Sequence, residues 1–305
     1  MTTYNSNQKG FWANVRECLF LLLIVFLVRT FVFGLYQVPT GSMEKTMLVG
    51  ERFFADKFTP LFIKPKHKDI IAFNDPVYPY SKNKIVRLFQ EYVWGPSNWT
   101  KRVIAIPGDH IKGVIEDGKP VVYLNGKKLD EPYINQYPLI REWKVDHTEL
   151  MGLIRKGISE YQLAELIVPK TYDPHKPFND QPFYRIDPNK VHRLENGEPW
   201  LVHSGTALEP REKKDQSVGK DYWSSSDEFD VHLKDNQYWL MGDNRLGSKD
   251  SRFLGPVDGR LIHGKIRFRI WSIDSYESWW IVDLIKNPID FFKRVRWSRF
   301  FQIIR

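Results

Sequence analysis

The longest apolar stretch of the chain lies near its N-terminus. Uncharged apolar residues run from Cys18 to Val28, and after Arg29 and Thr30 the apolar character continues to Tyr36. A helix needs about 20 residues to cross a bilayer, so the stretch is long enough if Arg29 extends its charge to one membrane surface. We therefore predict a transmembrane anchor over residues 18–36, preceded by an N-terminal tail over residues 1–17.

A buried core helix and a cleaved signal peptide are the two alternatives to a permanent anchor. The stretch is N-terminal and apolar on all sides, which argues against a core helix. It ends in the bulky sequence Phe-Gly-Leu-Tyr rather than in small residues, which argues against cleavage. The flanking charges, Lys9 and Arg16 against Glu17, indicate the orientation only weakly.

Beyond the anchor, the pattern changes to short runs in which apolar and polar residues alternate between turn-forming residues. Such runs are typical of β-strands. They occupy residues 51–58, 69–76, 101–111, 119–129, 236–244 and 259–271. An Asn-Gly pair at Asn125 lies between two apolar stretches and predicts a tight hairpin. The pattern therefore predicts a mainly β fold, an antiparallel β-sheet or small barrel.

The segment between about Leu129 and Lys234 differs from its flanks. It contains nine of the 19 prolines and two predicted helices. These helices begin at Asp146 and Ser159, each three residues before a Glu or Gln, as in a capping box. Strand patterning returns only afterwards. We therefore predict one β domain, residues 37–128 and 235–275, interrupted by a loop-rich α+β subdomain over residues 129–234.

The C-terminal tail, residues 276–305, is aromatic and basic, and it is too charged to span a membrane. Two interpretations of this tail stay open. It is either an interfacial segment attracted to anionic lipid or a basic tail packed on its own domain.

Composition narrows the possible partners. The net charge of +8 favours acidic partners, such as phospholipid headgroups or nucleic acid. The sequence has no recognisable nucleic-acid-binding motif, so we expect no nucleic-acid partner. The aromatic content of 15% suits contact with a membrane interface. Cys18 is the only cysteine, so no intrachain disulfide forms. None of the eight histidines shows zinc-ligand spacing, and we expect neither a metal nor a cofactor.

Ser42 is the first candidate for chemistry, because it follows Gly41 in a short turn directly after the anchor. A serine hydroxyl is a poor nucleophile unless a base takes its proton. No Gly-x-Ser-x-Gly motif surrounds Ser42, and a turn serine is otherwise an ordinary structural residue. Lys45 completes a Ser-x-x-Lys match, as in penicillin-binding proteins and β-lactamases. That arrangement needs a sustained helix, whereas Gly50 and a strand pattern follow here.

Lys101 is the stronger candidate for the base. The strand period places Lys101, Val103 and Ala105 on one face, where small apolar neighbours would desolvate the ammonium group. Burial lowers a lysine pKa from about 10.4 by up to about 3–5 units, and a neutral amine near pH 7–8 can act as a general base. The alternative is a lysine at a strand edge that extends into solvent.

A polar loop between apolar strands, residues 241–257, supplies the remaining candidates. One interpretation is a solvated loop with a surface Asp250–Arg252 pair of little energetic value. In the other, Asp250 and Arg252 brace the loop while the Ser248 hydroxyl orients a lysine.

Four stretches together resemble, in their order and character, the conserved boxes of type I signal peptidases. They read VPTGSM, KHKDIIAF, KRVIAIPGD and MGDNRLGSKDSRFLGPV. This family consists of membrane-anchored serine endopeptidases with a Ser/Lys dyad. The resemblance implies that Ser42 is the nucleophile, Lys101 the general base and Ser248 the hydroxyl that orients the lysine. Thr40 stands where the family has a serine whose hydroxyl joins the backbone N–H of the nucleophile in an oxyanion hole.

The resemblance also implies the substrate and the location. The β domain would be the catalytic core, with an apolar groove in which the peptide binds as an added strand. Val38, Pro39, Met43 and Met47 would line this groove, and small residues would precede the cut. The implied partners are signal-peptide-bearing preproteins and membrane phospholipid. The implied location is the inner (plasma) membrane, crossed once, with the catalytic domain on the non-cytoplasmic side.

Two departures from the family pattern accompany this resemblance. Lys45 replaces a proline that is common after the nucleophile, and Lys68-Asp69 stands where Arg-Gly-Asp is frequent.

Two other classes of protein remain as alternatives. A self-cleaving Ser/Lys repressor would carry a cytosolic DNA-binding domain, which this N-terminus is not. A non-catalytic, membrane-anchored binding protein would lose nothing on Ser42→Ala substitution.

Overall fold

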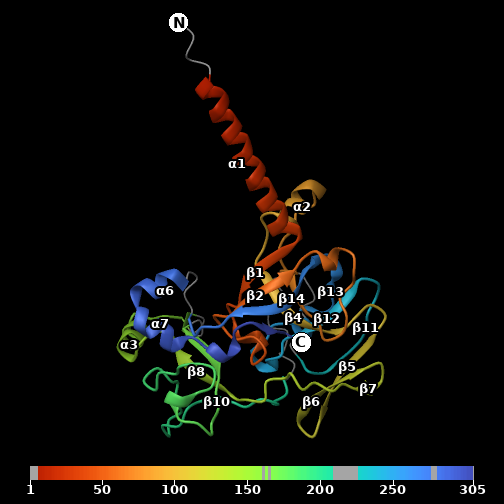
Figure 1. The fold of residues 1–305 in the computed structure, drawn as a ribbon. Helices are drawn as coiled ribbons and strands as arrows, with labels where there is room; N and C mark the ends of the chain where they lie inside the picture. Colours follow the sequence, from red (N-terminus) through yellow and green to blue (C-terminus); the bar gives the residue numbers. More distant parts are fainter. Residues whose placement is uncertain (1–5, 160–161, 164–165, 209–225, 276–279, 305) are drawn as a thin grey trace.

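The computed structural model describes residues 6–159, 162–163, 166–208, 226–275 and 280–304. Its first element, helix α1 (Ser6–Phe31), projects away from the rest of the molecule (Figure 1). Residues Phe11–Phe31 are long and apolar enough to cross a membrane, and none of the most apolar part is buried against the protein. The core-helix alternative is therefore wrong. The helix also ends before the predicted anchor does, because Phe33–Gln37 form strand β1.

The main sheet has eight strands, and every pairing in it is antiparallel, as predicted. Its order is β1-β2-β14-β3-β4-β12-β13, and β15 pairs with β14. The strands besides β1 are β2 (Arg52–Asp56), β3 (Ile70–Asn74), β4 (Asn98–Ala105), β12 (Gln237–Met241), β13 (Val257–Asp258), β14 (Ile262–Trp271) and β15 (Gln302–Ile303). Strands from both ends of the β domain thus meet in one sheet.

Strand β3 shows why this sheet is stable. Ile70 and Ala72 belong to one apolar cluster, and Ile71 and Phe73 belong to another. Successive side chains of a strand point to opposite faces, so β3 is covered on both faces, which explains its continuous apolar sequence.

A second sheet has the order β11-β5-β6-β7, from β5 (His110–Glu116), β6 (Lys119–Leu124), β7 (Lys127–Lys128) and β11 (Phe229–His232). Asn125 and Gly126 have φ of 52° and 78°, the left-handed pair that a tight hairpin needs, so the predicted turn is confirmed. Strand β11 falls inside the predicted insertion but pairs with β5 of the first β segment.

The insertion contains a third sheet, β10-β8-β9, from β8 (Leu139–Trp143), β9 (Ile167–Thr171) and β10 (Leu201–Val202). The first predicted helix is α3 (His147–Arg155), and the Asp146 side chain accepts from the Glu149 N–H at 2.8 Å. The second predicted helix includes residues 160–161 and 164–165, which lie outside the described residues. The apolar pattern of this helix was expected to continue to Val168, which is wrong, because β9 begins at Ile167.

The C-terminal tail packs on its own domain. Helices α6 (Trp280–Lys286) and α7 (Pro288–Arg294) enclose an apolar cluster that contains Phe291 and Ile273. The Arg299 Nε lies 2.6 Å from a Glu51 carboxylate oxygen in the main domain. The described part of the tail therefore packs on its own domain, while Ile285 and Ile289 each stay 74% exposed.

The remaining elements are helices α2 (Lys84–Tyr92) and α5 (Ser251–Leu254) and the short 3-10 turns 41–43, 59–61, 178–180, 245–247, 259–261 and 297–299.

Candidate active site

Ser42 lies in the 3-10 turn Gly41–Met43, between strands β1 and β2, and its side chain is buried. Glycine is required beside it, since a Cβ at position 41 would lie 2.5 Å from the Glu44 carboxylate. The turn is also attached to the polar loop 241–257. Asn244 donates from its side chain to the Gly41 carbonyl at 3.0 Å and from its backbone N–H to the Ser42 carbonyl at 3.2 Å.

Lys101 lies beside Ser42. Its Nζ donates to the Ser42 Oγ at 2.9 Å and to the Thr100 carbonyl at 3.1 Å. The lysine is only 5% exposed, and this burial lowers its pKa from 10.5 to about 8. The strand-edge alternative for Lys101 is therefore wrong. The structure brings together a serine hydroxyl and an amine that loses its proton near neutral pH.

The predicted common face of Lys101, Val103 and Ala105 is interrupted. The register between β4 and β12 shifts after the Trp239–Ala105 pair, and Ala105 packs in a different apolar cluster from Val103. A β-bulge re-aims the side chains beyond it. Val103 and Lys101 lie on the regular side of the bulge, whereas Ala105 lies beyond it.

Lys45 takes no part in this arrangement. The turn at Ser42 is a single 3-10 turn rather than a sustained helix. No hydrogen bond between the Lys45 side chain and Ser42 occurs among the described residues, and the Lys45 carbonyl accepts from Arg299 at 3.2 Å.

The polar loop is held by buried ion pairs rather than by solvent. Arg252 donates to both carboxylate oxygens of Asp250 at 2.9 Å and to Asp227 at 2.8 Å. Desolvation favours a higher pKa for Asp250, but the Arg252 guanidinium prevails and holds it below its ordinary value. Asp250 also accepts from the Gly242 N–H at 3.0 Å, so the pair fixes the loop to the end of β12.

The structure does not join the two predicted hydroxyls to the dyad. The Ser248 Oγ is buried and makes no hydrogen bond of standard geometry among the described residues, but it lies near enough to the Asp250 carboxylate to help lower the pKa of Asp250. It lies close to the dyad, because a Cβ at Gly242 would be 2.3 Å from Ser248 Oγ and 2.4 Å from the Ser42 carbonyl. Thr40 is exposed, and its side chain does not cap the turn that begins after it.

Ser42 and Lys101 open onto a cavity of about 690 Å³. All four residues predicted to line a groove, Val38, Pro39, Met43 and Met47, line this cavity, as does Thr40. Its opposite wall is formed by residues 97–101 and by Gly247 and Lys249. Among the described residues, two strands that line this cavity have an edge without a partner strand: β1 pairs with β2 alone, and β4 pairs with β12 only from Arg102 onward.

Arg102 and Asp243 were not recognised from the sequence. The Arg102 guanidinium binds both carboxylate oxygens of Asp243, at 2.8 and 2.6 Å, and both residues are buried. Thr46 also donates to Asp243, at 2.5 Å. Asp243 therefore connects the lysine strand to the serine loop. It lies within the polar loop that the sequence analysis singled out, but nothing in that loop indicates its partner.

Glu44 is a second residue that sequence reasoning missed. Its buried carboxylate accepts hydrogen bonds from the Thr171 N–H and hydroxyl and from the Tyr184 hydroxyl, both in the insertion. Burial raises the pKa of Glu44 to about 7. The insertion thus contacts the serine loop two residues after the nucleophile.

Away from this cavity, pairing of β5 with β11 brings together His110, Asp230 and His232, with ligand atoms within 4.8 Å of one another. Asp230 bonds His110 at 2.6 Å and lies 3.4 Å from the Lys112 ammonium. These contacts hold the three side chains together on a largely exposed surface.

Comparison with known proteins identifies the class. The family model described as signal peptidase, peptidase S26, matches residues 11–271. The chain therefore belongs to this family of serine peptidases, as the resemblance predicts. The family supports cleavage of signal peptides and preproteins as substrates, and with helix α1 it suggests a membrane-anchored enzyme.

Individual relatives agree with the family. The chain is 26% identical to signal peptidase I of Buchnera aphidicola subsp. Schizaphis graminum over 90% of this chain and 79% of the relative. It is 25% identical to the Rickettsia conorii signal peptidase I (98% and 94%) and 25% identical to that of Streptococcus pneumoniae serotype 4 (84% and 91%). A solved signal peptidase I from Enterococcus faecalis is 17% identical, with a TM-score of 0.26, over 67% of this chain and 97% of that chain.

Proposed function

We propose that this protein cleaves signal peptides from exported preproteins at a membrane surface, through an acyl-enzyme on Ser42 with Lys101 as the general base. The observation that carries the proposal is the 2.9 Å hydrogen bond between Lys101 Nζ and Ser42 Oγ at the wall of a cavity. A pKa of about 8 leaves roughly a tenth of the lysine neutral at pH 7, enough for a general base.

The mechanism is acyl transfer. Neutral Lys101 takes the Ser42 proton as the hydroxyl oxygen attacks the carbonyl carbon of the scissile bond, and the carbonyl oxygen becomes an oxyanion. The Ser42 N–H and the Thr40 hydroxyl stabilise that oxyanion, and each such donor is typically worth about 10²–10³ in kcat. Protonated Lys101 then gives its proton to the leaving amine, and the C–N bond breaks. Water then attacks the ester with Lys101 again as base, the bond between the acyl carbon and Ser42 Oγ breaks, and protonated Lys101 returns the proton to Ser42 Oγ.

Three further residues hold this machinery in place. The Ser248 hydroxyl, buried close to the dyad and beside the Asp250 carboxylate, orients the Lys101 amine. Asp250 and Arg252 brace the loop that carries Ser248. A buried pair of this kind is sensitive to loss of either partner, because the other charge is then left unpaired.

The substrate binds as an added strand between the two unpaired backbone edges of the cavity. Val38, Pro39, Met43 and Met47 supply the apolar wall, which suits small side chains before the cut. Helix α1 anchors the enzyme once in the inner (plasma) membrane, with the catalytic domain on the non-cytoplasmic side. A signal peptide has its cleavage site just beyond its apolar segment, so both reacting groups are held near the same membrane surface.

Cleavage of a model preprotein by the purified full chain in detergent tests this proposal. We expect Ser42→Ala and Lys101→Ala each to abolish cleavage, and Lys45→Ala, the matched control, to retain most of it. Full processing by Lys101→Ala would contradict the assignment of the base. Full processing by Ser42→Ala would contradict the assignment of the nucleophile, and no cleavage by the unsubstituted chain would favour a non-catalytic, membrane-anchored binding protein.

A further inference from the structure

Helix α2 (Lys84–Tyr92) presents an apolar face that nothing in the described structure covers. Ile85, Leu88, Phe89 and Tyr92 follow the i, i+3, i+4, i+7 spacing of one helix face. No residue of α2 is buried, and Leu88 and Phe89 are 56% and 52% exposed. Trp94, just after the helix, is 80% exposed. Since exposed apolar area costs about 25 cal/mol per Å² in water, such a face indicates a partner.

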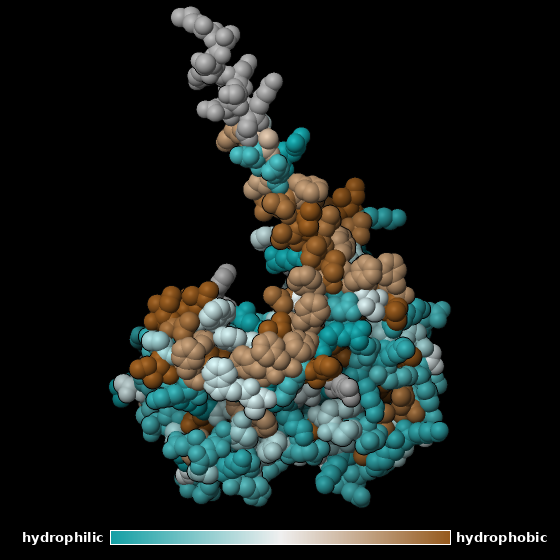
Figure 2. All heavy atoms as spheres, in the orientation of Figure 1, coloured by the Kyte–Doolittle hydropathy of each residue, from teal (hydrophilic) through white to brown (hydrophobic). Residues whose placement is uncertain are grey.

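The position of α2 indicates what that partner is. The helix lies beside the end of α1 that joins the globular domain (Figure 1), and the Phe31 and Tyr92 rings are 6.1 Å apart. Figure 2 shows the apolar surface of α1 continuing onto this region. The cavity between the two segments is lined by Phe26, Arg29 and Thr30 of α1. The apolar face of α2 is therefore continuous with the surface that spans the membrane.

The segment of α1 that adjoins α2 has the length expected if α2 lies in the membrane interface. Phe26 precedes the end of α1 at Phe31 by five residues, which is about 7.5 Å at 1.5 Å per residue. An amphipathic helix in the membrane interface buries its apolar face about 5–10 Å deep. Tyr92 and Trp94 add the amphipathic aromatic side chains that are enriched at this level.

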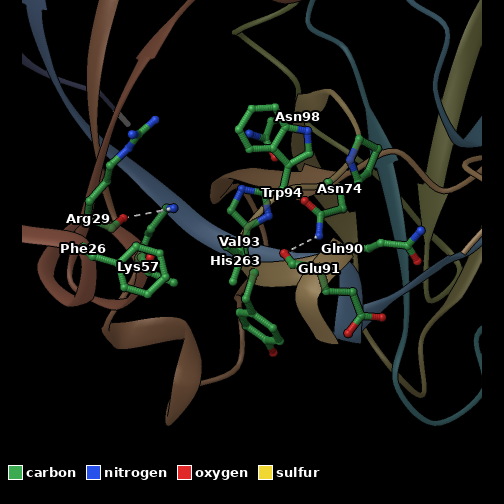
Figure 3. Close-up of a pocket in the computed structure, with 14 residues that line it drawn as sticks. Phe26, Arg29, Lys57, Asn74, Gln90, Glu91, Val93, Trp94, Asn98 and His263 are labelled. Atoms are coloured by element: carbon green, nitrogen blue, oxygen red, sulfur yellow. Dashed lines mark hydrogen bonds between the residues drawn. The ribbon is translucent and has the colours of Figure 1, made fainter. Parts of the chain in front are cut away.

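The cavity between α1 and α2, about 360 Å³, is cationic (Figure 3). Lys57 Nζ donates to the Arg29 carbonyl at 3.3 Å, so two cationic residues adjoin each other there. Burial, and then the neighbouring Arg29 charge, lowers the pKa of Lys57. Within the part of the chain that the structure describes, neither cation has a carboxylate at ion-pair distance. Glu91, the acidic residue of this lining, is already paired with Arg87 at 2.7 Å.

The other polar groups of the cavity are neutral. Burial lowers the pKa of His263 to about 4, so its ring is uncharged at neutral pH. The Asn74 side chain donates to the Glu91 carbonyl at 3.0 Å, and Asn98 also lines the cavity. The cavity thus combines two cations that lack a carboxylate partner in the described structure, neutral hydrogen-bonding groups, and one carboxylate, Glu91, that Arg87 already binds. At a membrane surface, this set matches the phosphate of a lipid headgroup.

We propose that α2 lies in the membrane interface and that the cavity between α1 and α2 binds the phosphate of one phospholipid headgroup. The inference rests on the proposed anchoring of α1 in a membrane. Because the chain runs from α2 directly into β4, which carries Lys101, lipid binding would position the catalytic strand relative to the bilayer. Asn98 lines both this cavity and the one at Ser42.

Titration of the full chain with short-chain phosphatidylglycerol in non-ionic detergent tests the headgroup site. Binding is measured in the Ser42→Ala background, so the result does not depend on proteolysis. We expect Lys57→Gln and Arg29→Gln each to raise the Kd about tenfold or more, while Lys57→Arg binds within about twofold of the parent, because the charge is kept. Lys119→Gln, at an exposed lysine of β6, is the matched control and should change nothing.

Three results would overturn the headgroup site: unchanged binding by Lys57→Gln, equal weakening by Lys119→Gln, or displacement of the lipid by equimolar inorganic phosphate. The last would indicate a general anion site rather than a lipid site. Each of these results leaves the peptidase proposal intact, because that proposal is judged by preprotein cleavage with Ser42 present.

The depth of α2 is tested separately. Cys18 is the only cysteine, so Cys18→Ser allows a single fluorophore to be attached through Leu88→Cys or, as a control, Lys119→Cys. In phosphatidylglycerol vesicles, lipid-borne quenchers should reduce the emission at position 88 at least threefold more than at position 119. Equal quenching at both positions would place α2 in water and overturn the proposal.

Discussion

Two cavities of this molecule each contain a lysine whose pKa is lowered, but the amines have different neighbours. Lys101, beside Ser42, is 5% exposed, and burial lowers its pKa to about 8. Lys57, between α1 and α2, is half-buried, and its pKa is lowered by burial and then by Arg29. One amine contacts the hydroxyl that we propose it deprotonates, whereas the other lies beside a second cation, where we propose that an anion binds.

The difference shows that the protonation of a buried basic side chain depends on whether a carboxylate is free to pair with it. Arg102, next to Lys101 on β4, is equally buried, but it is paired with Asp243 at 2.8 and 2.6 Å. Asp243 and Asp250 both attract the Lys101 charge, yet each is already bound by an arginine. Lys101 therefore has no ion-pair partner of its own among the described residues, and desolvation is the largest influence on its pKa.

Replacement of each lysine by arginine should give the largest difference in effect between the two cavities. Arginine keeps the charge but cannot lose its proton, so Lys101→Arg should lower kcat/KM for preprotein cleavage by about 10³-fold or more. Lys57→Arg should leave phosphatidylglycerol binding within about twofold. Activity of Lys101→Arg above a tenth of wild type would refute the role of Lys101 as a base.

The pH dependence of the two functions should run in opposite directions. Because neutral Lys101 is the active form, kcat/KM should rise about tenfold per pH unit below pH 8 and then level off. Phosphatidylglycerol binding should instead weaken as the pH rises, because Lys57 loses its charge. Rate and binding measurements between pH 6 and 10 check both; a rate profile that is flat from pH 6 to 9 would contradict the assignment.

Glu44 extends the comparison to a buried acid. Burial raises the pKa of Glu44, whereas it lowers the pKa of the two lysines. Its pKa is raised from 4.5 to about 7, so the folded protein holds a proton that the unfolded chain releases between these values. The free energy of unfolding should therefore fall by roughly 3 kcal/mol as the pH rises from 4.5 to 7.5. In Glu44→Gln this component should disappear. Urea unfolding of both proteins at both pH values measures this change in the free energy of unfolding. An equal change with pH in the wild type and in Glu44→Gln would contradict the raised pKa of Glu44.

Lys68 gives the smallest expected effect, because its side chain is exposed and only its backbone is unusual. Its φ of 68° lies in the left-handed region that favours glycine, the residue found there in the Arg-Gly-Asp pattern of the family. Lys68→Gly should raise the free energy of unfolding by about 0.5–1 kcal/mol. Lys66→Gly, at an exposed lysine without a positive φ, should lower it. The same denaturation measurement distinguishes them, and destabilisation by Lys68→Gly would exclude backbone strain at this position.

The predictable parts of the fold are those whose stabilising interactions join residues close together in the sequence. Helix α3 has its cap three residues from its partner, and the Asn125 turn needs only two adjacent residues. Helix α2 shows the same kind of local period, so its amphipathic spacing could have been recognised too. The contacts of Glu44 could not, because its partners Thr171 and Tyr184 are 127 and 140 positions away.

The sequence by itself determined the apolar anchor, the strand-rich domain and the candidates Ser42 and Lys101, because local periodicity and ordered motifs need no knowledge of distant contacts. Only the tertiary structure decided that these two side chains meet across 59 positions. It also decided that arginines occupy the carboxylates around Lys101, since a pKa depends on burial and on charges that folding brings close. The cationic cavity beside α2 likewise exists only because α1, Lys57 and the α2 segment converge after folding.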